Sequence, residues 1–203
     1  NNKEDAINDI KNILDGKFET SKKVIIEEFL EGEEASYFII TDGTNFKQIG
    51  TAQDHKRIGE KDTGLNTGGM GAYSPSTLIT KEIEKKIIDQ IILPTIKGMD
   101  EIGCKYKGVL YAGLMIKNNE PKLIEYNIRF GDPECQALMM RLEDDLFDII
   151  FSCIEEKLDN TPIKWSKNPS ITIVASSKWY PENFQINKEL KNLPKNLNKN
   201  EQM

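Results

Sequence analysis

Apolar residues near the start of the chain recur every three or four positions, a spacing that predicts an amphipathic helix. The residues of this stripe are Ala6, Ile7, Ile10, Ile13 and Leu14. Three apolar runs follow, at residues 24–30, 35–41 and 46–52, and each has the length and residue types of a strand. The pair Asp42-Gly43 separates the second run from the third and is a strong signal for a β-hairpin.

A second helical stripe begins at Lys81, with Thr80 before it as the predicted N-cap. Pro94 is expected to end or kink this helix, because proline has no backbone N–H to donate. Residues 108–117 then predict a buried strand, and residues 122–128 predict its hairpin partner.

The last third of the chain is predicted to hold two helices and one strand. Residues 132–134, Asp-Pro-Glu, have the order typical of a helix start: a cap, a proline and an acid in the first turn. Helical spacing continues to residue 142 and resumes over 146–154, and residues 171–176 predict a short strand. From residue 187 the chain is polar and is expected to be irregular. Hairpins interleaved with helices indicate the α+β class.

Charge and composition exclude several classes of protein. The 203 residues carry a net charge of −6, so no overall basic field attracts nucleic acid or an anionic membrane. The longest apolar run, residues 109–116, is too short to cross a bilayer. Three well-separated cysteines without C-x-x-C spacing predict reduced thiols and a cytoplasmic location. The single histidine, His55, cannot build a multi-histidine zinc site and is expected to be structural or to contact a substrate.

The first candidate site is the predicted strand at residues 122–128 and the residues that follow it. In an extended chain Glu125, Asn127 and Arg129 share one face, opposite Ile124. A carboxylate and an amide two residues apart offer the oxygen ligands that Mg²⁺ takes alongside phosphates. The planar guanidinium of Arg129 suits a phosphoryl or acyl-phosphate oxygen. A solvated polar strand face gives the same alternation, and by pattern alone it is the commoner explanation.

The second candidate is a glycine-rich, polar segment at residues 53–76. Its glycines at 68, 69 and 71 permit positive φ, so backbone N–H groups could form an anion-binding nest. Lys56 and Arg57 would add positive charge beside it. The spacing matches neither a Walker A loop nor a Rossmann fingerprint, and a flexible surface loop accounts for the pattern equally well.

The third candidate is the acidic segment at residues 27–34, which holds five glutamates in eight positions. The backbone groups at a strand end can bind an adenine edge, and a carboxylate nearby can hold ribose hydroxyls. A solvated acidic turn is the commoner explanation of this pattern alone.

Taken in order, these segments closely resemble the phosphoribosylamine–glycine ligase family of the ATP-grasp superfamily. The resemblance rests on residues 27–36, 53–57, 66–75 and 124–134, and it covers roughly residues 3–180. The strings Asn-Thr-Gly-Gly-Met-Gly-Ala-Tyr and Arg-Phe-Gly-Asp-Pro-Glu are specific to this family and not shared by ATP-grasp enzymes at large.

The resemblance implies an ATP-grasp domain of the α+β class over residues 1–165, forming the second part of an ATP clamp. Residues 166–203 would begin a truncated C-terminal domain with a polar tail. Such ligases also carry an N-terminal α/β domain and a Gly/Lys-rich phosphate lid ahead of the matching segment. The chain starts without methionine inside a helical pattern, so we expect it to be a piece of a longer protein whose N-terminal part is a partner of this one.

The resemblance also implies an activity in purine biosynthesis. In such enzymes the carboxylate of glycine attacks the γ-phosphate of ATP, and the amine of 5-phosphoribosylamine then displaces phosphate from the glycyl phosphate. The expected products are glycinamide ribonucleotide, ADP and phosphate, with Mg²⁺ or Mn²⁺ as cofactor. Two other functions stay open: a ligase for another carboxylate or amine, and a non-catalytic nucleotide-binding module whose partner supplies the missing lid.

By resemblance, each candidate residue receives an expected role. The metal ligands would be Glu125 and Asn127, and the catalytic oxyanion stabiliser would be Arg129. The adenine hinge would be Glu27, Glu28, Phe29 and Leu30, with Glu34 on the ribose. The substrate side would be lined by Asp54, Lys56, Arg57, Gly68, Gly69 and Gly71.

Overall fold

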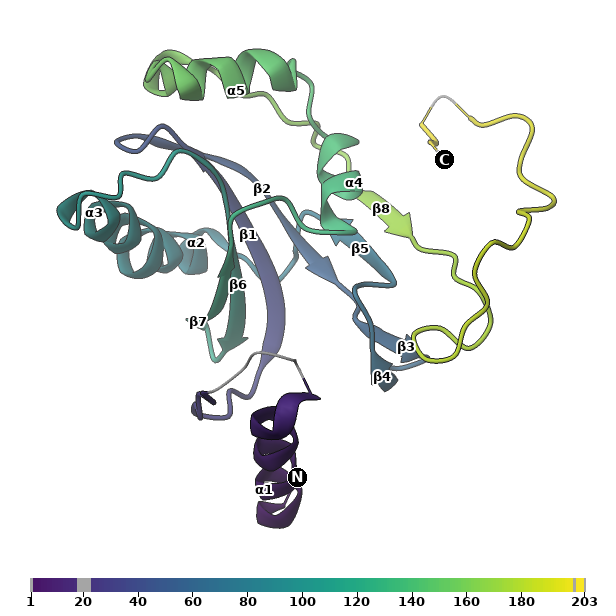
Figure 1. The fold of residues 1–203 in the computed structure, drawn as a ribbon. Coiled ribbons are helices and arrows are strands. Elements are labelled where there is room, and N and C mark those ends of the chain that lie inside the picture. The colour runs from purple at the N-terminus through teal and green to yellow at the C-terminus, as the bar shows by residue number, and fades with distance from the viewer. Residues whose placement is uncertain (1, 18–22, 199, 203) are drawn as a thin grey trace. The chain divides into compact units, whose positions relative to one another are not determined.

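The protein is described here from a computed structural model, which places residues 2–17, 23–198 and 200–202. Contacts divide the chain into a first unit over residues 1–31 and a second unit over residues 32–203 (Figure 1). In chain order the elements are α1 (Lys3–Asn12), η1 (Ile13–Lys17), β1 (Glu33–Thr41), β2 (Phe46–Asp54), β3 (Arg57–Gly59), β4 (Thr63–Asn66), β5 (Gly71–Ser74), α2 (Lys81–Ile87), η2 (Ile88–Ile92), α3 (Leu93–Glu101), β6 (Gly108–Lys117), β7 (Glu120–Asn127), α4 (Glu134–Met139), α5 (Leu146–Ile154), η3 (Leu158–Asn160) and β8 (Ser170–Ile173).

The first unit contains the predicted N-terminal helix, α1. Its N-cap is Asn2, whose side chain accepts a hydrogen bond from the amide of Asp5 at 2.8 Å. The strand predicted at residues 24–30 is wrong, because residues 23–31 are irregular and Ile25 and Phe29 are largely exposed. An apolar run makes a strand only where a neighbour pairs with its backbone, and no strand pairs with this run in the described part of the chain.

The second unit is built on a six-stranded sheet in the order β7-β6-β1-β2-β5-β8, in which every neighbouring pair is antiparallel. The strands predicted at 35–41, 46–52 and 108–117 are confirmed as β1, β2 and β6. The predicted hairpin partner of β6 is confirmed as β7. Asn118 and Asn119 turn between β6 and β7 with φ of 54° and 62°, the left-handed geometry that asparagine tolerates in tight hairpins.

Helices cover both faces of the sheet, so β1 is buried on both sides. Tyr37 and Ile39 pack with residues of α2, η2 and α3, whereas Phe38 and Ile40 pack with residues of α4 and α5. Figure 1 shows the two groups of helices on opposite sides of β1. The alternation of side chains along a strand therefore separates two hydrophobic cores.

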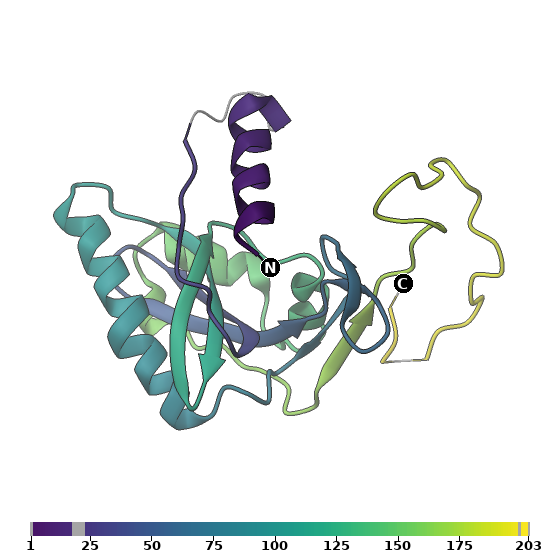
Figure 2. The same cartoon turned by 90° about the horizontal axis from the view of Figure 1, so that it is seen from below.

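The helix predicted from Lys81 passes through Pro94 where an end or a kink was expected. Thr80 caps it as predicted, accepting from the amide of Ile83 at 3.3 Å. Ahead of the proline the helix widens into the π-helical segment η2, where the amide of Leu93 donates to the carbonyl of Ile88, five residues back. This local change in hydrogen bonding accommodates the missing N–H of Pro94, so α2, η2 and α3 continue as one rod (Figure 2).

The helix predicted over 146–154 is confirmed as α5, whereas the helix before it and the last strand are shorter than predicted. The helix expected from residue 132 begins at Glu134 and ends at Met139, and the last strand is β8 (Ser170–Ile173), which pairs with β5. The described residues after β8 form no helix or strand, as expected for the polar tail. The domain boundary at residue 165 stays a prediction. Within the described ranges, no helix has the length and apolar character needed to cross a membrane.

A β-bulge in β2 generates a test of the packing between β2 and α4. Gly50 has a φ of 127°, and a Cβ there would lie 2.4 Å from Cδ2 of Leu138. We expect Gly50→Ala to lower the free energy of unfolding by about 2–4 kcal/mol, because it adds backbone strain to overpacking. Urea titration measures this change.

The matched control is Gly98→Ala in α3, where a Cβ would meet nothing within 4 Å. This change should raise stability by about 0.5–1 kcal/mol, since alanine favours a helix interior. Equal effects of the two substitutions would contradict the packing described for Gly50.

Candidate functional site

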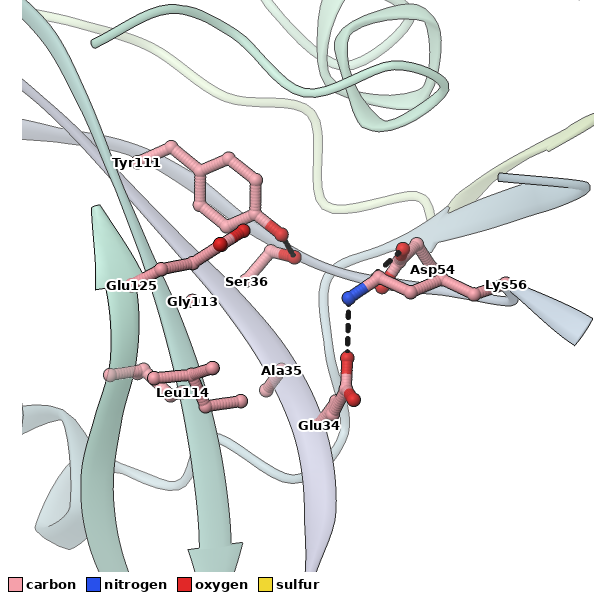
Figure 3. A pocket seen from close by; sticks show the side chains of 10 residues that line it. Glu34, Ala35, Ser36, Asp54, Lys56, Tyr111, Gly113, Leu114 and Glu125 are labelled. Atoms are coloured by element: carbon pink, nitrogen blue, oxygen red, sulfur yellow. Dashed lines mark hydrogen bonds and ion pairs between the residues drawn. The ribbon is translucent and has the colours of Figure 1, made fainter. Parts of the chain in front are cut away.

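A pocket opens in the second unit where β1, β2, β6 and β7 meet, with a cavity volume of about 120 Å³. Its polar lining comes from Glu34, Ser36, Asp54, Lys56, Tyr111 and Glu125 (Figure 3). Four of the predicted site residues, Glu34, Asp54, Lys56 and Glu125, therefore lie around one hollow, although β1, β2 and β7 are far apart in the sequence.

The register of three neighbouring strands forms one wall of this pocket. Ser36 on β1 pairs with Gly113 on β6, which in turn pairs with Glu125 on β7. Directly paired residues share a face of the sheet, so Ser36 and Glu125 flank a glycine. A Cβ at Gly113 would lie 3.4 Å from Cγ of Glu125, and its absence leaves room for the Glu125 side chain.

A β-bulge in β7 corrects one prediction about the strand faces. Gly113 pairs with Glu125 but the next β6 residue, Leu114, pairs with Leu123, so Ile124 is an extra residue. Ile124 was expected on the face opposite Glu125, yet both line the pocket. A pattern of side chains that alternate strictly between the two faces of a strand does not predict such an inserted residue.

The two predicted metal ligands are adjacent. The side-chain amide of Asn127 donates to Oε1 of Glu125 at 3.0 Å. No group of three or more His, Cys, Asp or Glu in the described residues could hold a metal. One carboxylate beside one amide fits Mg²⁺, which takes most of its ligands from water and phosphates and needs few from the protein.

Arg129 lies two residues beyond the end of β7. Its guanidinium donates to the carbonyl of Phe130 at 2.8 Å, and it does not line the pocket. Arg129 could share the face of Glu125 and Asn127 only if β7 extended to residue 129, but β7 ends at Asn127. The catalytic role of Arg129 stays a prediction.

Lys56 is held by two carboxylates at the pocket edge. Its Nζ lies 2.6 Å from Oε2 of Glu34 and 3.9 Å from Oδ2 of Asp54, as Figure 3 shows. Burial alone would lower the pKa of Lys56, but the hydrogen bond to Glu34 and the charge of Asp54 raise it above its usual value. Lys56 is therefore a fixed positive charge between two strands.

Asp54 is the most strongly perturbed acid of the pocket. Its side chain is only 7% exposed, and burial raises its pKa from 3.8 to about 6 against the opposing charge of Lys56. The charges of Glu134 and Glu34 raise it further. A carboxyl group whose pKa is raised by burial beside a cation is typical of a functional site.

Glu134 lies behind the pocket lining, and the sequence pattern identified it only as the acid in the first turn of a helix. It is 2% exposed, and its Oε1 accepts from Oγ of Ser36 at 3.0 Å. Oγ of Ser36 also lies 2.9 Å from the hydroxyl of Tyr111. Burial raises the pKa of the Tyr111 hydroxyl, and Glu134 adds to that rise. The only signal in the sequence was the Arg-Phe-Gly-Asp-Pro-Glu string itself.

Of the glycines at 68, 69 and 71, the last two lie in close packing, and the anion-binding nest stays a prediction. Only Gly69 has a positive φ, 132°, and a Cβ there would lie 2.4 Å from Cδ of Pro133. A Cβ at Gly71 would lie 2.7 Å from the carbonyl oxygen of Thr172. In this structure the amides of Thr67, Gly69 and Met70 donate to protein oxygens.

Arg57 and Gly68 are not among the residues that line the pocket. Arg57, in β3, donates to the carbonyl of Gly64 at 2.6 Å. The expected adenine hinge, Glu27, Glu28, Phe29 and Leu30, belongs to the first unit. The assignment of these residues, and of Gly68, Gly69 and Gly71, to substrate or ATP stays a prediction.

The fold is that of ATP-grasp proteins: an antiparallel sheet with helices on both faces and a pocket at its strands. A solved structure described as phosphoribosylamine–glycine ligase from Thermotoga maritima matches with a TM-score of 0.81 and 30% identity, over 91% of this chain and 46% of that one. Residues 1–135 match the family model for the phosphoribosylglycinamide synthetase ATP-grasp (A) domain. The chain belongs to this family.

Curated relatives agree with this assignment. A phosphoribosylamine–glycine ligase of Vigna unguiculata is 54% identical over 173 residues, which is 84% of this chain and 56% of that protein. One from Haemophilus influenzae is 47% identical over 203 residues, which is 98% of this chain and 47% of that protein. The chain thus spans about half the length of the curated relatives it matches.

The environment of Asp54 predicts a pH-dependent change in stability. A carboxyl whose pKa is raised on folding, here from 3.8 to about 6, destabilises the folded state above pH 6 and has no such effect below pH 3.8. We expect Asp54→Asn to raise the free energy of unfolding by about 1–3 kcal/mol at pH 7.5 and to leave it unchanged at pH 3.5. Denaturant titrations at the two pH values measure the difference.

Asp89→Asn serves as the control, because Asp89 lies on the α2–α3 rod in an exposed ion pair with Lys85. It should change stability little at either pH. A loss of stability in Asp54→Asn at pH 7.5 would contradict the environment described for Asp54.

Proposed function

We propose that this protein carries the ATP-grasp part of a phosphoribosylamine–glycine ligase, a carbon–nitrogen ligase of purine biosynthesis. The reaction joins glycine to 5-phosphoribosylamine at the expense of ATP, through glycyl phosphate, and gives glycinamide ribonucleotide, ADP and phosphate. The observation that carries this proposal is the hydrogen bond from Asn127 to Glu125. Glu125 lines one pocket together with Asp54 and Lys56, in a chain of this family.

Glu125 and Asn127 would hold Mg²⁺ or Mn²⁺ at the edge of the pocket. When bound, such an ion neutralises negative charge on the transferred phosphoryl group. The protein's own contribution is to hold the two oxygen donors together, which the Asn127 to Glu125 hydrogen bond at 3.0 Å achieves. Arg129, which follows them, would stabilise the developing negative charge once it turns from the Phe130 carbonyl.

The remaining charged residues would bind the substrates. Glu34 would accept the ribose hydroxyls of ATP, and Lys56 beside it would hold an anionic group of a substrate. Asp54 supplies a buried negative charge, which suits a positively charged amine. A site closed from water would protect the acyl phosphate from hydrolysis.

A cytoplasmic location agrees with this role in small-molecule metabolism. Cys104, Cys135 and Cys153 are all free thiols in the structure, as expected of a reducing compartment. The proposed partners are small molecules and the N-terminal part of the same enzyme.

The role of Glu125 is tested by Glu125→Ala in the protein at its full natural length. We expect ADP release from Mg-ATP to fall at least about a hundredfold, because Glu125 is the only carboxylate of the two proposed metal ligands. Wild-type release should require both glycine and 5-phosphoribosylamine, which is checked by omitting each in turn.

Glu120→Gln, in the same strand β7, is the matched control. Glu120 pairs with Lys86 on the surface, and its loss should leave turnover within about twofold. Turnover of Glu125→Ala within a few-fold of wild type would remove the metal role. Binding of ATP without any substrate-dependent release would favour a non-catalytic nucleotide-binding module.

A further inference from the structure

Lys56 belongs to the two-residue connection between β2 and β3, and the segment at residues 67–71 holds the backbone of this connection. The amide of Met70 donates to the carbonyl of His55 at 2.8 Å. The carbonyl of Lys56 accepts two hydrogen bonds from Thr67, one from its amide at 2.7 Å and one from its hydroxyl at 2.8 Å. A carbonyl oxygen has two lone pairs, so Thr67 occupies both of them.

The hydroxyl of Thr67 also binds a second backbone group. Besides donating to Lys56, it accepts from the amide of Gly69 at 3.0 Å. Gly69 is buried, and a Cβ on it would lie 2.4 Å from Cδ of Pro133, so the chain at Gly69 has little room to move. The Thr67 hydroxyl therefore connects the backbone of Lys56 to a closely packed part of the domain.

The position of the Lys56 backbone determines where its ammonium group lies. Nζ is 2.6 Å from Oε2 of Glu34 and 3.9 Å from Oδ2 of Asp54, and all three side chains line the pocket (Figure 3). A lysine side chain is long and flexible, so holding its backbone reduces the number of positions that the ammonium group can reach. An ammonium group has three N–H donors, and those that Glu34 does not use are available to a ligand.

We propose that Thr67 is a positioning residue that acts through Lys56: its hydroxyl holds the Lys56 carbonyl and thereby keeps the ammonium group in the pocket beside Glu34. The hydroxyl and not the bulk of the side chain performs this role, because valine has nearly the same shape but can neither donate to Lys56 nor accept from Gly69. That Lys56 binds an anionic group of a substrate rests on the proposed function. The contact between Thr67 and Lys56 does not depend on it.

The first test measures how fast acetic anhydride labels Lys56 in the protein at its full natural length, with peptide mass spectrometry as the readout. Only a neutral amine reacts, and the ion pair with Glu34 keeps Lys56 protonated. We expect Thr67→Val to raise the labelling rate of Lys56 about threefold or more. Thr67→Ser keeps the hydroxyl and should leave the rate within about twofold of the wild type.

Two controls distinguish this effect from a general loosening of the fold. Lys86 is also held by an ion pair, with Nζ 2.5 Å from Oε1 of Glu120, and its labelling rate should be the same in every variant. Thr63→Val removes a similar hydrogen bond, from a threonine hydroxyl to a backbone carbonyl at 2.7 Å, and should leave the rate at Lys56 unchanged. An unchanged rate at Lys56 in Thr67→Val, or an equal rise at Lys86, would overturn the inference.

A second test asks whether Thr67 acts through Lys56 during turnover. Thr67→Val should lower kcat/KM for ADP release about threefold to tenfold, and Thr67→Ser should retain most of the wild-type value. In a Lys56→Met background, Thr67→Val should cause a further loss of no more than about twofold, because the effects of residues that act together do not add. Additive losses would contradict a role through Lys56. If Lys56→Met is inactive, the labelling rates decide.

The labelling test separates this inference from the proposed function, because it needs no substrate. If Thr67→Val speeds the labelling of Lys56 but wild-type ADP release does not depend on glycine and 5-phosphoribosylamine, the inference holds and only the proposed reaction fails. If release depends on both substrates but Lys56 is labelled equally fast in the wild type and in Thr67→Val, the reaction holds and the role of Thr67 fails.

Discussion

The register across β1, β6 and β7 is the constraint on which the pocket depends. It sets Ser36, Gly113 and Glu125 side by side on one face of the sheet. A shift by one residue in either pairing would turn Glu125 or Ser36 into the opposite core, where a charged or polar side chain would lose its partners. The two hydrophobic cores resist such a shift, because β1 has apolar residues on both faces, Tyr37 toward one core and Phe38 toward the other. The cores thereby fix the position of the site.

The sequence was sufficient to predict the elements whose signals are local. The run at 108–117 and the cap at Thr80 were predicted correctly, because strand burial and N-capping depend on residues close in the chain. The pairing of Glu125 with Asn127 also followed from their spacing. Ile124 was placed on the wrong face because a bulge depends on how two strands meet, which alternation in one strand does not record. The run at 24–30 has the composition of a strand, but composition alone does not provide a strand for it to pair with.

The burial of charge in the pocket was the least predictable feature. Asp54 and Glu134 come from β2 and from the start of α4, and only the folded sheet brings them near each other. Burying two carboxylates with only one lysine nearby costs stability. Apolar residues at these positions would avoid that cost. Such a cost persists where it serves binding, since a carboxylate raised to a pKa of about 6 is ready for a cationic ligand or a proton. Under the proposed function, stability and substrate binding are therefore opposed at Asp54.

The two strings most specific to this family occur together for a structural reason. Gly69, from the glycine-rich segment, packs against Pro133 so closely that a Cβ would lie 2.4 Å from its Cδ and 3.0 Å from the carbonyl oxygen of Asp132. Pro133 in turn precedes Glu134, whose carboxylate occupies the space above Gly131. The glycine that appeared suited to bind an anion therefore allows the turn that orients the buried acid. A side chain at position 69 would therefore displace Pro133 and, through it, the neighbouring Glu134.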